Sequence, residues 1–238
     1  MTLRRETMQC PCLPQPFTGG FLEDCWEWDI NAKSPAVLLS PCRRAVYFHV
    51  DSLLQSEATA GVRGTKGFTH GVHYWEVKFL EPPYGTSVMV GAGTKQARLH
   101  LGNYTFVNLL GMDSESWGLS YKGTIWHGGR SKRYTEPFYD KATIIGVDLN
   151  LYDGTMAFYK NGHNLGVAFT GLNKIGVPLY PMASSTAAET ELQLGARSCR
   201  FTSLQEQCLH TVLQHLVDKA HIDTLPLPEF IRGQLKEF

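Results

Sequence analysis

The stretch VDLNLYDGTMAFYKNGHNLGVAF, residues 147–169, carries the strongest local pattern in the chain. Asp153-Gly154 and Asn161-Gly162 each stand between short runs of apolar and aromatic residues. Both dipeptides favour the tight turns of β-hairpins, because those turns need backbone angles that glycine and asparagine adopt easily. The stretch therefore predicts three consecutive antiparallel strands, at 145–149, 155–159 and 165–169.

Further short strands are predicted upstream of this stretch. Residues 75–79 alternate apolar with charged side chains, which is the period of a half-buried strand. Residues 87–94, SVMVGAGT, form an apolar run suited to a covered central strand, with glycines where another segment passes closely. Residues 117–126 hold two more runs around a Lys122-Gly123 turn. Many short strands without an internal helix pattern predict a mainly β protein built as an antiparallel β-sandwich.

The C-terminal residues 203–238 follow a different, helical pattern. Ser203 and Glu206 match a capping box, so a helix is expected from residue 204, and its apolar pattern continues to residue 220. At about 100° per residue, the apolar side chains cover roughly 220°, about twice the arc that docking one face requires. Such a helix has two surfaces to bury, one against its own domain and the other against a different chain. The arc is formed by Leu204, Cys208, Leu209, Val212, Leu213, Leu216, Val217 and Ala220.

The next segment, residues 225–228, reads Leu-Pro-Leu-Pro. Two alternating prolines fix φ and remove two hydrogen-bond donors, so the segment is expected to be a rigid extended elbow. A short amphipathic helix follows, with Ile231, Leu235 and Phe238 on one face.

The order of helix, elbow and helix resembles a SOCS box. In that family the first helix binds Elongin C through a Ser/Thr-Leu-x-x-x-Cys-x-x-x-aliphatic motif, and the Leu-Pro-aliphatic-Pro segment selects the cullin. The resemblance implies Elongin-binding positions at Ser203, Leu204, Cys208 and Val212. It implies cullin-binding positions at Leu225, Pro226, Leu227, Pro228, Ile231 and Leu235.

The middle of the chain resembles a SPRY domain. The resemblance rests on residues 147–169 followed by LYPM (179–182), and on GVHYWEV (71–77), VGAG (90–93) and ESWGL (115–119). A SPRY domain followed directly by a SOCS box is typical of the SPRY domain-containing SOCS box proteins. The expected organisation is a loose N-terminal segment at 1–25, a SPRY sandwich at 26–201 and a small α-helical SOCS box at 202–238.

The resemblance implies a substrate receptor of a cullin-RING ubiquitin ligase that promotes ubiquitination and proteasomal degradation. Its expected partners are Elongin C with Elongin B, cullin 5 with its RING subunit, and a target protein held by the SPRY loops. Ubiquitin transfer belongs to the partner subunits, so this chain is expected to contribute proximity and no catalytic group. Two alternatives stay open, a SPRY adaptor that does not direct degradation and a carbohydrate-binding sandwich.

The resemblance also implies where the target binds. In relatives, a pocket on the sandwich loops reads a short Asn-containing peptide with a tyrosine, an arginine and a Val-Trp-Gly segment. Tyr104 matches the tyrosine, Ser52 stands in place of the arginine, and Thr186, Ala187 and Ala188 stand in place of Val-Trp-Gly. A shallower pocket with a different peptide specificity is expected, because an indole and a guanidinium are missing. The alternative is that Tyr104 is a buried structural tyrosine.

An enzymatic role is not expected. A glycoside hydrolase needs two carboxylates about 5–10 Å apart in one cleft, whereas Glu76 and Asp148 are single and far apart in the sequence. No phosphate-binding loop, HExxH or GxSxG element occurs, and no cofactor is expected. His70 and His73 are expected to lead into a strand rather than to bind a metal.

The amino-acid composition restricts which classes of partner and which cellular compartment are expected. Lys plus Arg equals Asp plus Glu at 22 each, with no basic run of five, so nucleic acid and anionic membrane are not expected partners. The N-terminal residues lack the apolar core of a secretion signal. Six cysteines without such a signal favour reduced thiols in the cytoplasm, the nucleus or both. Unligated cysteines are the expectation, and a zinc site from Cys10, Cys12, Cys25 and Cys42 is the open alternative.

Overall fold

The computed structural model describes residues 22–49, 58–101, 105–201, 204–216 and 218–237. The chain divides into two compact units, Met1–Arg200 and Phe201–Phe238. No helix in these ranges combines the length and the apolar character needed to cross a membrane.

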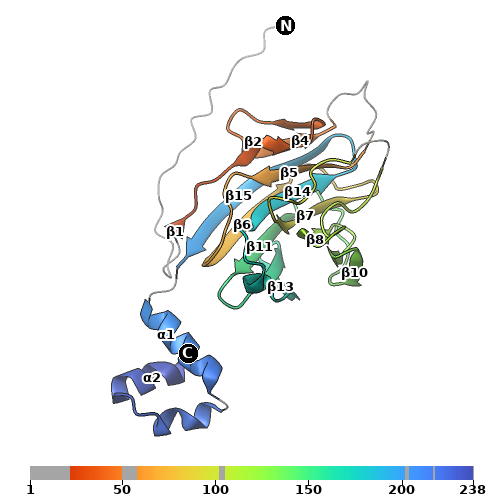
Figure 1. Ribbon diagram of the computed structural model, residues 1–238. Helices are drawn as coiled ribbons and strands as arrows, with labels where there is room; N and C mark the ends of the chain where they lie inside the picture. The colour runs from red at the N-terminus through yellow and green to blue at the C-terminus, as the bar shows by residue number, and fades with distance from the viewer. Residues whose placement is uncertain (1–21, 50–57, 102–104, 202–203, 217, 238) are drawn as a thin grey trace. The chain divides into compact units, whose positions relative to one another are not determined.

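The first unit is a sandwich of two antiparallel sheets (Figure 1). The first sheet runs in the order β13 (His163–Phe169), β12 (Thr155–Lys160), β11 (Ile144–Asn150), β6 (Val72–Phe79), β15 (Thr190–Arg200), β4 (Ala45–Phe48) and β3 (Val37–Leu39), and β1 (Leu22–Glu23) also pairs with β15. The second sheet runs β10 (Arg130–Arg133), β9 (Thr124–His127), β8 (Ser116–Ser120), β7 (Val88–Gly93), β14 (Tyr180–Ser185), β5 (Ala60–Gly64) and β2 (Trp28–Lys33). A short 3-10 helix, η1 (Leu172–Lys174), follows β13. The predicted antiparallel sandwich is confirmed.

The three strands predicted from residues 145–169 are β11, β12 and β13, paired in that order. Asn161 and Gly162 join the last two with φ values of 50° and 82°. A two-residue hairpin turn requires these positive angles. Asn-Gly adopts them easily, so the dipeptide predicts the turn correctly.

Burial along β6 and β7 also follows the sequence pattern. In β6, His73, Trp75, Val77 and Phe79 are buried and alternate with partly exposed residues. Every residue of β7 is buried. A Cβ atom on Gly91 in β7 would collide with the carbonyl oxygen of Trp117 in β8, so this position requires glycine.

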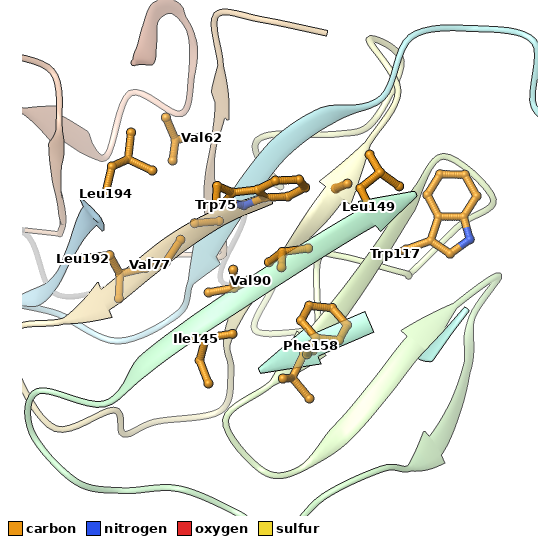
Figure 2. Packing of buried hydrophobic residues seen from close by; sticks show 14 of the residues in the cluster. Val62, Trp75, Val77, Val90, Trp117, Ile145, Leu149, Phe158, Leu192 and Leu194 are labelled. Atoms are coloured by element: carbon orange, nitrogen blue, oxygen red, sulfur yellow. The ribbon is translucent and has the colours of Figure 1, made fainter. Parts of the chain in front are cut away.

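The main core lies between the two sheets. Trp28 and Trp75 are among its largest fully buried side chains. Figure 2 shows Val77, Val90, Ile145, Leu149, Phe158 and Leu192, which come from β6, β7, β11, β12 and β15, meeting in this layer. A packed core of this kind holds the strand ends, and hence the loops, in fixed positions.

The second unit contains α1 (Leu204–His215), the 3-10 helix η2 (Lys219–Thr224) and α2 (Glu229–Glu237). Its own small core consists of Leu209, Ile222 and Leu235. Partly buried side chains pack around that core, namely Val212, Leu213, Leu216, Leu225, Leu227 and Ile231.

The prediction of one helix from residue 204 to 220 was wrong in its extent. α1 ends at His215, and the Asp218 carboxylate accepts a hydrogen bond from the Ala220 N–H, at 3.0 Å, as the N-cap of η2. This local cap starts a new helix, which competes with continuation of the first. Ser203 and Val217 lie outside the described residues, so the capping box stays a prediction.

The prediction of an extended elbow was wrong in shape: residues 225–227 form a bend, and the Leu227 N–H donates a hydrogen bond to the Leu225 carbonyl oxygen at 2.8 Å. Leu225 has φ −66° and ψ 138°, and α2 begins at Glu229 directly after Pro228.

Candidate functional site

The loop between β14 and β15, residues 186–189, contains the positions predicted to replace Val-Trp-Gly. The Oγ1 atom of Thr186 accepts a hydrogen bond from the Ser87 N–H, at 2.8 Å, and donates one to the Ser87 carbonyl oxygen, at 3.1 Å. Thr186 and Ala187 are buried, whereas Ala188 is partly exposed. Of the three predicted contact residues, Ala188 therefore offers the most side-chain surface to a partner.

A second loop, residues 80–87, packs against this one. The Tyr84 hydroxyl donates a hydrogen bond to the carbonyl oxygen of Ala188, and the Tyr121 hydroxyl donates one to the carbonyl oxygen of Gly85, at 2.5 Å. Gly85 has φ +79°, and a Cβ atom there would lie 3.1 Å from the Cβ atom of Ala187. The close approach of the two loops therefore depends on this glycine.

Tyr84 is a surface residue that sequence reasoning missed. Its side chain is 50% exposed although its hydroxyl is held by Ala188. The only signal in the sequence was an aromatic residue directly after Pro82-Pro83, in a segment otherwise typical of a loop. A fixed, half-exposed aromatic ring is a common anchor in protein interfaces.

The other two predicted target-binding positions, Ser52 and Tyr104, lie outside the described residues. His49 and His100 are described residues within four positions of them in the sequence. Burial lowers the pKa of His49, a hydrogen bond with the Ser185 backbone raises it, and the charge of His100 lowers it further. His49 and His100 therefore lie near the end of β14, at the same end of the sandwich as the 186–189 loop.

The predicted Elongin-binding positions lie on α1. Cys208 is exposed, while the adjacent Leu209 is buried in the core of the second unit. Val212 is partly buried against that core. Leu204 is the first residue of α1, but its side chain lies outside the described part of the structure, as does Ser203.

The predicted cullin-binding positions divide into exposed and buried groups. Pro226 and Pro228 are exposed. Leu225, Leu227 and Ile231 are partly buried, and Leu235 is completely buried. A direct contact between Leu235 and a partner would require the unit to open, so the structure gives this residue a packing role.

The carboxylates of β6 and β11 are closer than their sequence separation suggested. Tyr74 in β6 pairs with Asp148 in β11, which places Asp148 next to the strand that carries Glu76. Glu76 accepts hydrogen bonds from the Tyr74 hydroxyl, at 2.9 Å, and from the Ala196 N–H, at 3.2 Å. Burial raises the pKa of Asp148. Both Glu76 oxygens are thus used within the fold, where they tie β6 to an irregularity in β15.

Potential metal ligands are dispersed across the described ranges. His73 is buried, stacks on Phe68 and has its Nε2 atom 2.8 Å from the His70 carbonyl oxygen, while His70 is exposed. Cys25 and Cys42 are exposed and free. Within these ranges no group of three or more His, Cys, Asp or Glu residues could hold a metal ion. Cys10 and Cys12 lie outside them.

Comparisons with known proteins agree with this geometry. Residues 72–197 match the SPRY domain family. Over 212 residues the chain is 42% identical to SPRY domain-containing SOCS box protein 3 of Xenopus tropicalis, a match that covers 88% of this chain and 57% of the relative. Human SPRY domain-containing SOCS box protein 1 is 32% identical over 222 residues, covering 87% of this chain and 79% of the relative. The chain belongs to the SPRY domain-containing SOCS box protein family.

Membership of this family confirms the resemblance that the motifs indicated. The chain spans a little over half the length of the Xenopus relative. Two solved structures share the fold of the sandwich. The PSpry domain of TRIM65 has a TM-score of 0.56 at 24% identity and covers 71% of this chain and 88% of its own. The SPRY domain of human HERC1 has a TM-score of 0.57 at 16% identity and covers 74% and 99%.

Proposed function

We propose that this chain is the substrate-recognition subunit of an Elongin BC–cullin 5–RING ubiquitin ligase. In this role the helical unit binds Elongin C, in complex with Elongin B, and then cullin 5 with its RING subunit. The SPRY sandwich holds a target protein, which is ubiquitinated and degraded by the proteasome. The proposal is supported by the SPRY and SOCS box names of the relatives. It places the chain in the cytoplasm, the nucleus or both.

The observation that carries the proposal is the two-sided character of α1. Leu209 is buried in the core of its own unit, whereas Cys208, one position earlier, is exposed. Successive helix positions point about 100° apart, so Cys208 belongs to a second apolar face. A small apolar side chain left exposed on a packed helix favours a pocket on another protein.

The elbow supplies a separate surface for cullin 5. Pro226 and Pro228 are exposed and precede α2 on a stiff backbone. A segment that is already rigid loses little conformational entropy when it binds. Since the elbow and α1 are different elements, the two partners can be lost independently by mutation.

The sandwich contributes binding rather than chemistry. At its loop end Ala188 and Tyr84 form an ordered surface. The resemblance implies that the target offers this surface a short peptide that contains asparagine. Holding such a target near the enzyme that carries ubiquitin raises the effective concentration of the reacting groups, which is the contribution expected of an adaptor.

The test is co-purification of the full chain from cells with the proteasome inhibited. Leu204→Ala combined with Cys208→Phe is expected to abolish recovery of Elongins B and C, because loss of an interface anchor costs about 2 kcal/mol or more. Since Cys208 is exposed, phenylalanine there fits the isolated chain. Cys25→Phe, a second exposed thiol but in the sandwich, is the matched control.

Recovery of both Elongins at wild-type levels by the α1 double variant would show that the SOCS box assignment is wrong. Elongin recovery with a target whose abundance does not change on proteasome inhibition would instead identify an adaptor that does not direct degradation.

A further inference from the structure

Glu189, in the loop between β14 and β15, adopts an unusual backbone conformation. Its φ is +59°, in the left-handed region that favours glycine. A residue with a Cβ atom adopts this region uncommonly, and such conformations cluster at functional sites. Glu189 is exposed, and it forms no ion pair with any residue that the structure describes. The loop therefore presents an unpaired carboxylate at the target-binding end of the sandwich.

Tyr84 lies close enough to Glu189 for their charges to interact. Burial raises the pKa of the Tyr84 hydroxyl, and the negative charge of Glu189 raises it further. The Tyr84 hydroxyl is bonded to the carbonyl oxygen of Ala188, the residue before Glu189. The ring is consequently fixed beside the carboxylate, with about half of its surface exposed.

Two lysines beside the 80–87 loop have partners of their own. The Lys141 Nζ atom lies 2.8 Å from a carboxylate oxygen of Glu81, and the Lys122 Nζ atom lies over the Tyr121 ring, 5.6 Å from its centroid. The sequences 50–57 and 102–104, which contain the other two predicted target-binding positions, include no lysine or arginine.

An exposed aromatic face next to an unpaired carboxylate is the combination that recognises an organic cation. The ring attracts the cation through its quadrupole, and the carboxylate pairs with its charge. We propose that Tyr84 and Glu189 form a cation-binding corner that receives a lysine or arginine side chain of the target protein. This inference rests on the proposed function, since it assigns a basic residue to the same target segment that carries the asparagine.

The cation-binding corner could also replace the arginine and the tryptophan that relatives use to bind a target and that this chain lacks. Ser52 and Ala187 stand in place of an arginine and a tryptophan, which are frequent interface anchors. Tyr84 supplies an aromatic surface from a different loop, and Glu189 reverses the sign of the charge offered to the target. A target that is basic near its asparagine is therefore favoured over an acidic one.

The experiment is a peptide array read with the full purified chain. Each peptide has one fixed asparagine in a Gly/Ser background, and each flanking position carries Lys, Arg, Leu, Gln or Glu in turn. Wild-type chain is expected to prefer Lys or Arg over Leu and Glu at a particular flanking position. The preference is expected to be roughly three- to tenfold at low salt and to weaken at about 1 M salt, because exposed charges are screened.

Four variants test the assignment. Glu189→Gln and Tyr84→Leu are expected to lose the preference, and Tyr84→Phe is expected to retain it because the ring remains. Glu23→Gln removes a similar exposed charge from β1, which pairs with the opposite end of β15, and is expected to change nothing. A further charge reversal, Glu189→Lys, is expected to shift the preference to Glu. Melting curves within a few degrees of wild type show that the variants remain folded.

The outcomes separate the two proposals. Asparagine peptides bound with no basic preference, or with a preference that survives both Glu189→Gln and Tyr84→Leu, would overturn the cation-binding corner while leaving target recognition intact. Binding to none of the asparagine peptides would overturn the peptide-recognition part of the proposed function and this inference with it. Loss of Elongin binding alone would count against the ligase assignment without affecting the corner.

Discussion

The hydroxyl of Tyr121 donates a hydrogen bond to the carbonyl oxygen of Gly85 at 2.5 Å, which fixes the 80–87 loop to the end of β8. Tyr121 is buried, whereas Gly85 is exposed at the surface. One side chain of the packed sandwich therefore positions the loop that carries Tyr84.

Tyr121→Phe is expected to loosen this loop more than it destabilises the fold. The Gly85 carbonyl is near solvent and can bond to water, so the loss of stability should be about 0.5–1.5 kcal/mol. Target binding should fall by a larger factor than Tm suggests, because the 80–87 loop is no longer held. Hydrogen exchange at Gly85 and Thr86, measured beside a binding assay, checks this. Tyr139→Phe, which changes a ring that packs edge-on against Tyr121 and is more exposed, serves as the control.

Asp24→Asn is expected to lower stability in a pH-dependent way. Burial alone would raise the pKa of Asp24, but His73, whose Nδ1 atom lies 3.8 Å from Oδ2, and Lys66, which donates a hydrogen bond to Oδ1 at 2.6 Å, lower it below its ordinary value. A carboxyl whose pKa is lowered by folding stabilises the protein above its unfolded pKa of about 4, and loses that contribution as the pH falls further. The wild type should thus exceed the Asp24→Asn variant in unfolding free energy by about 1–3 kcal/mol at neutral pH.

The same difference should shrink below about pH 4, where the wild-type carboxylate becomes protonated. Denaturant unfolding of both proteins between about pH 3 and pH 7, a range that spans the titration of a carboxyl group, measures it. A difference that stays constant over that range would contradict the ion pair of Asp24 with Lys66, whose Nζ–Oδ1 distance is 2.6 Å.

Pro226→Ala with Pro228→Ala is expected to weaken recovery of cullin 5 while leaving Elongin recovery unchanged. Both prolines are exposed, so the double variant loosens the backbone of the elbow without removing core contacts. Leu235→Ala serves as the comparison variant. It removes a completely buried side chain and should lower the free energy of unfolding by about 2–5 kcal/mol. Leu235→Ala should therefore lose both partners. Equal recovery of cullin 5 by the proline variant and wild type would make the elbow purely structural.

Gly91→Ala is expected to destabilise the sandwich by about 2 kcal/mol or more, since its Cβ atom would meet the backbone of β8 and not a movable side chain. Gly233 in α2 has open space around it, and alanine there should be neutral or stabilising by about 0.5–1 kcal/mol. Thermal unfolding of the two variants gives the comparison. A well-folded Gly91→Ala protein with unchanged Tm would mean that the strands are not packed as closely as described.

The parts of the fold that the sequence predicted are those with local causes. Asn161-Gly162 specifies its own turn, and Trp75, Val77 and Phe79 reveal their buried face through a period of two. The end of α1 was missed although its cause is also local, because the cap at Asp218 competes with an apolar pattern that runs past it.

The candidate site was only partly predictable because its contacts join distant parts of the chain. Tyr84 and Ala188 meet only after β7 and β14 have paired, and periodicity carries no information about that pairing. The burial of Thr186 follows from its hydrogen bonds with Ser87 across the same two strands. The resemblance implies target binding by residues 186–188, and the fold determines that Ala188 is more exposed than Thr186.

Leu225 and Leu227 of the elbow pack against the same apolar cluster as Leu209 of α1. Under the proposed function, a partner that binds either element recognises only the folded form of this small unit and shifts its folding equilibrium by mass action. Each partner therefore adds to the stability of the unit, while the contact surfaces on the elbow and on α1 stay separate. A receptor without its partners would therefore unfold at its C-terminus more often than a receptor in the assembled complex.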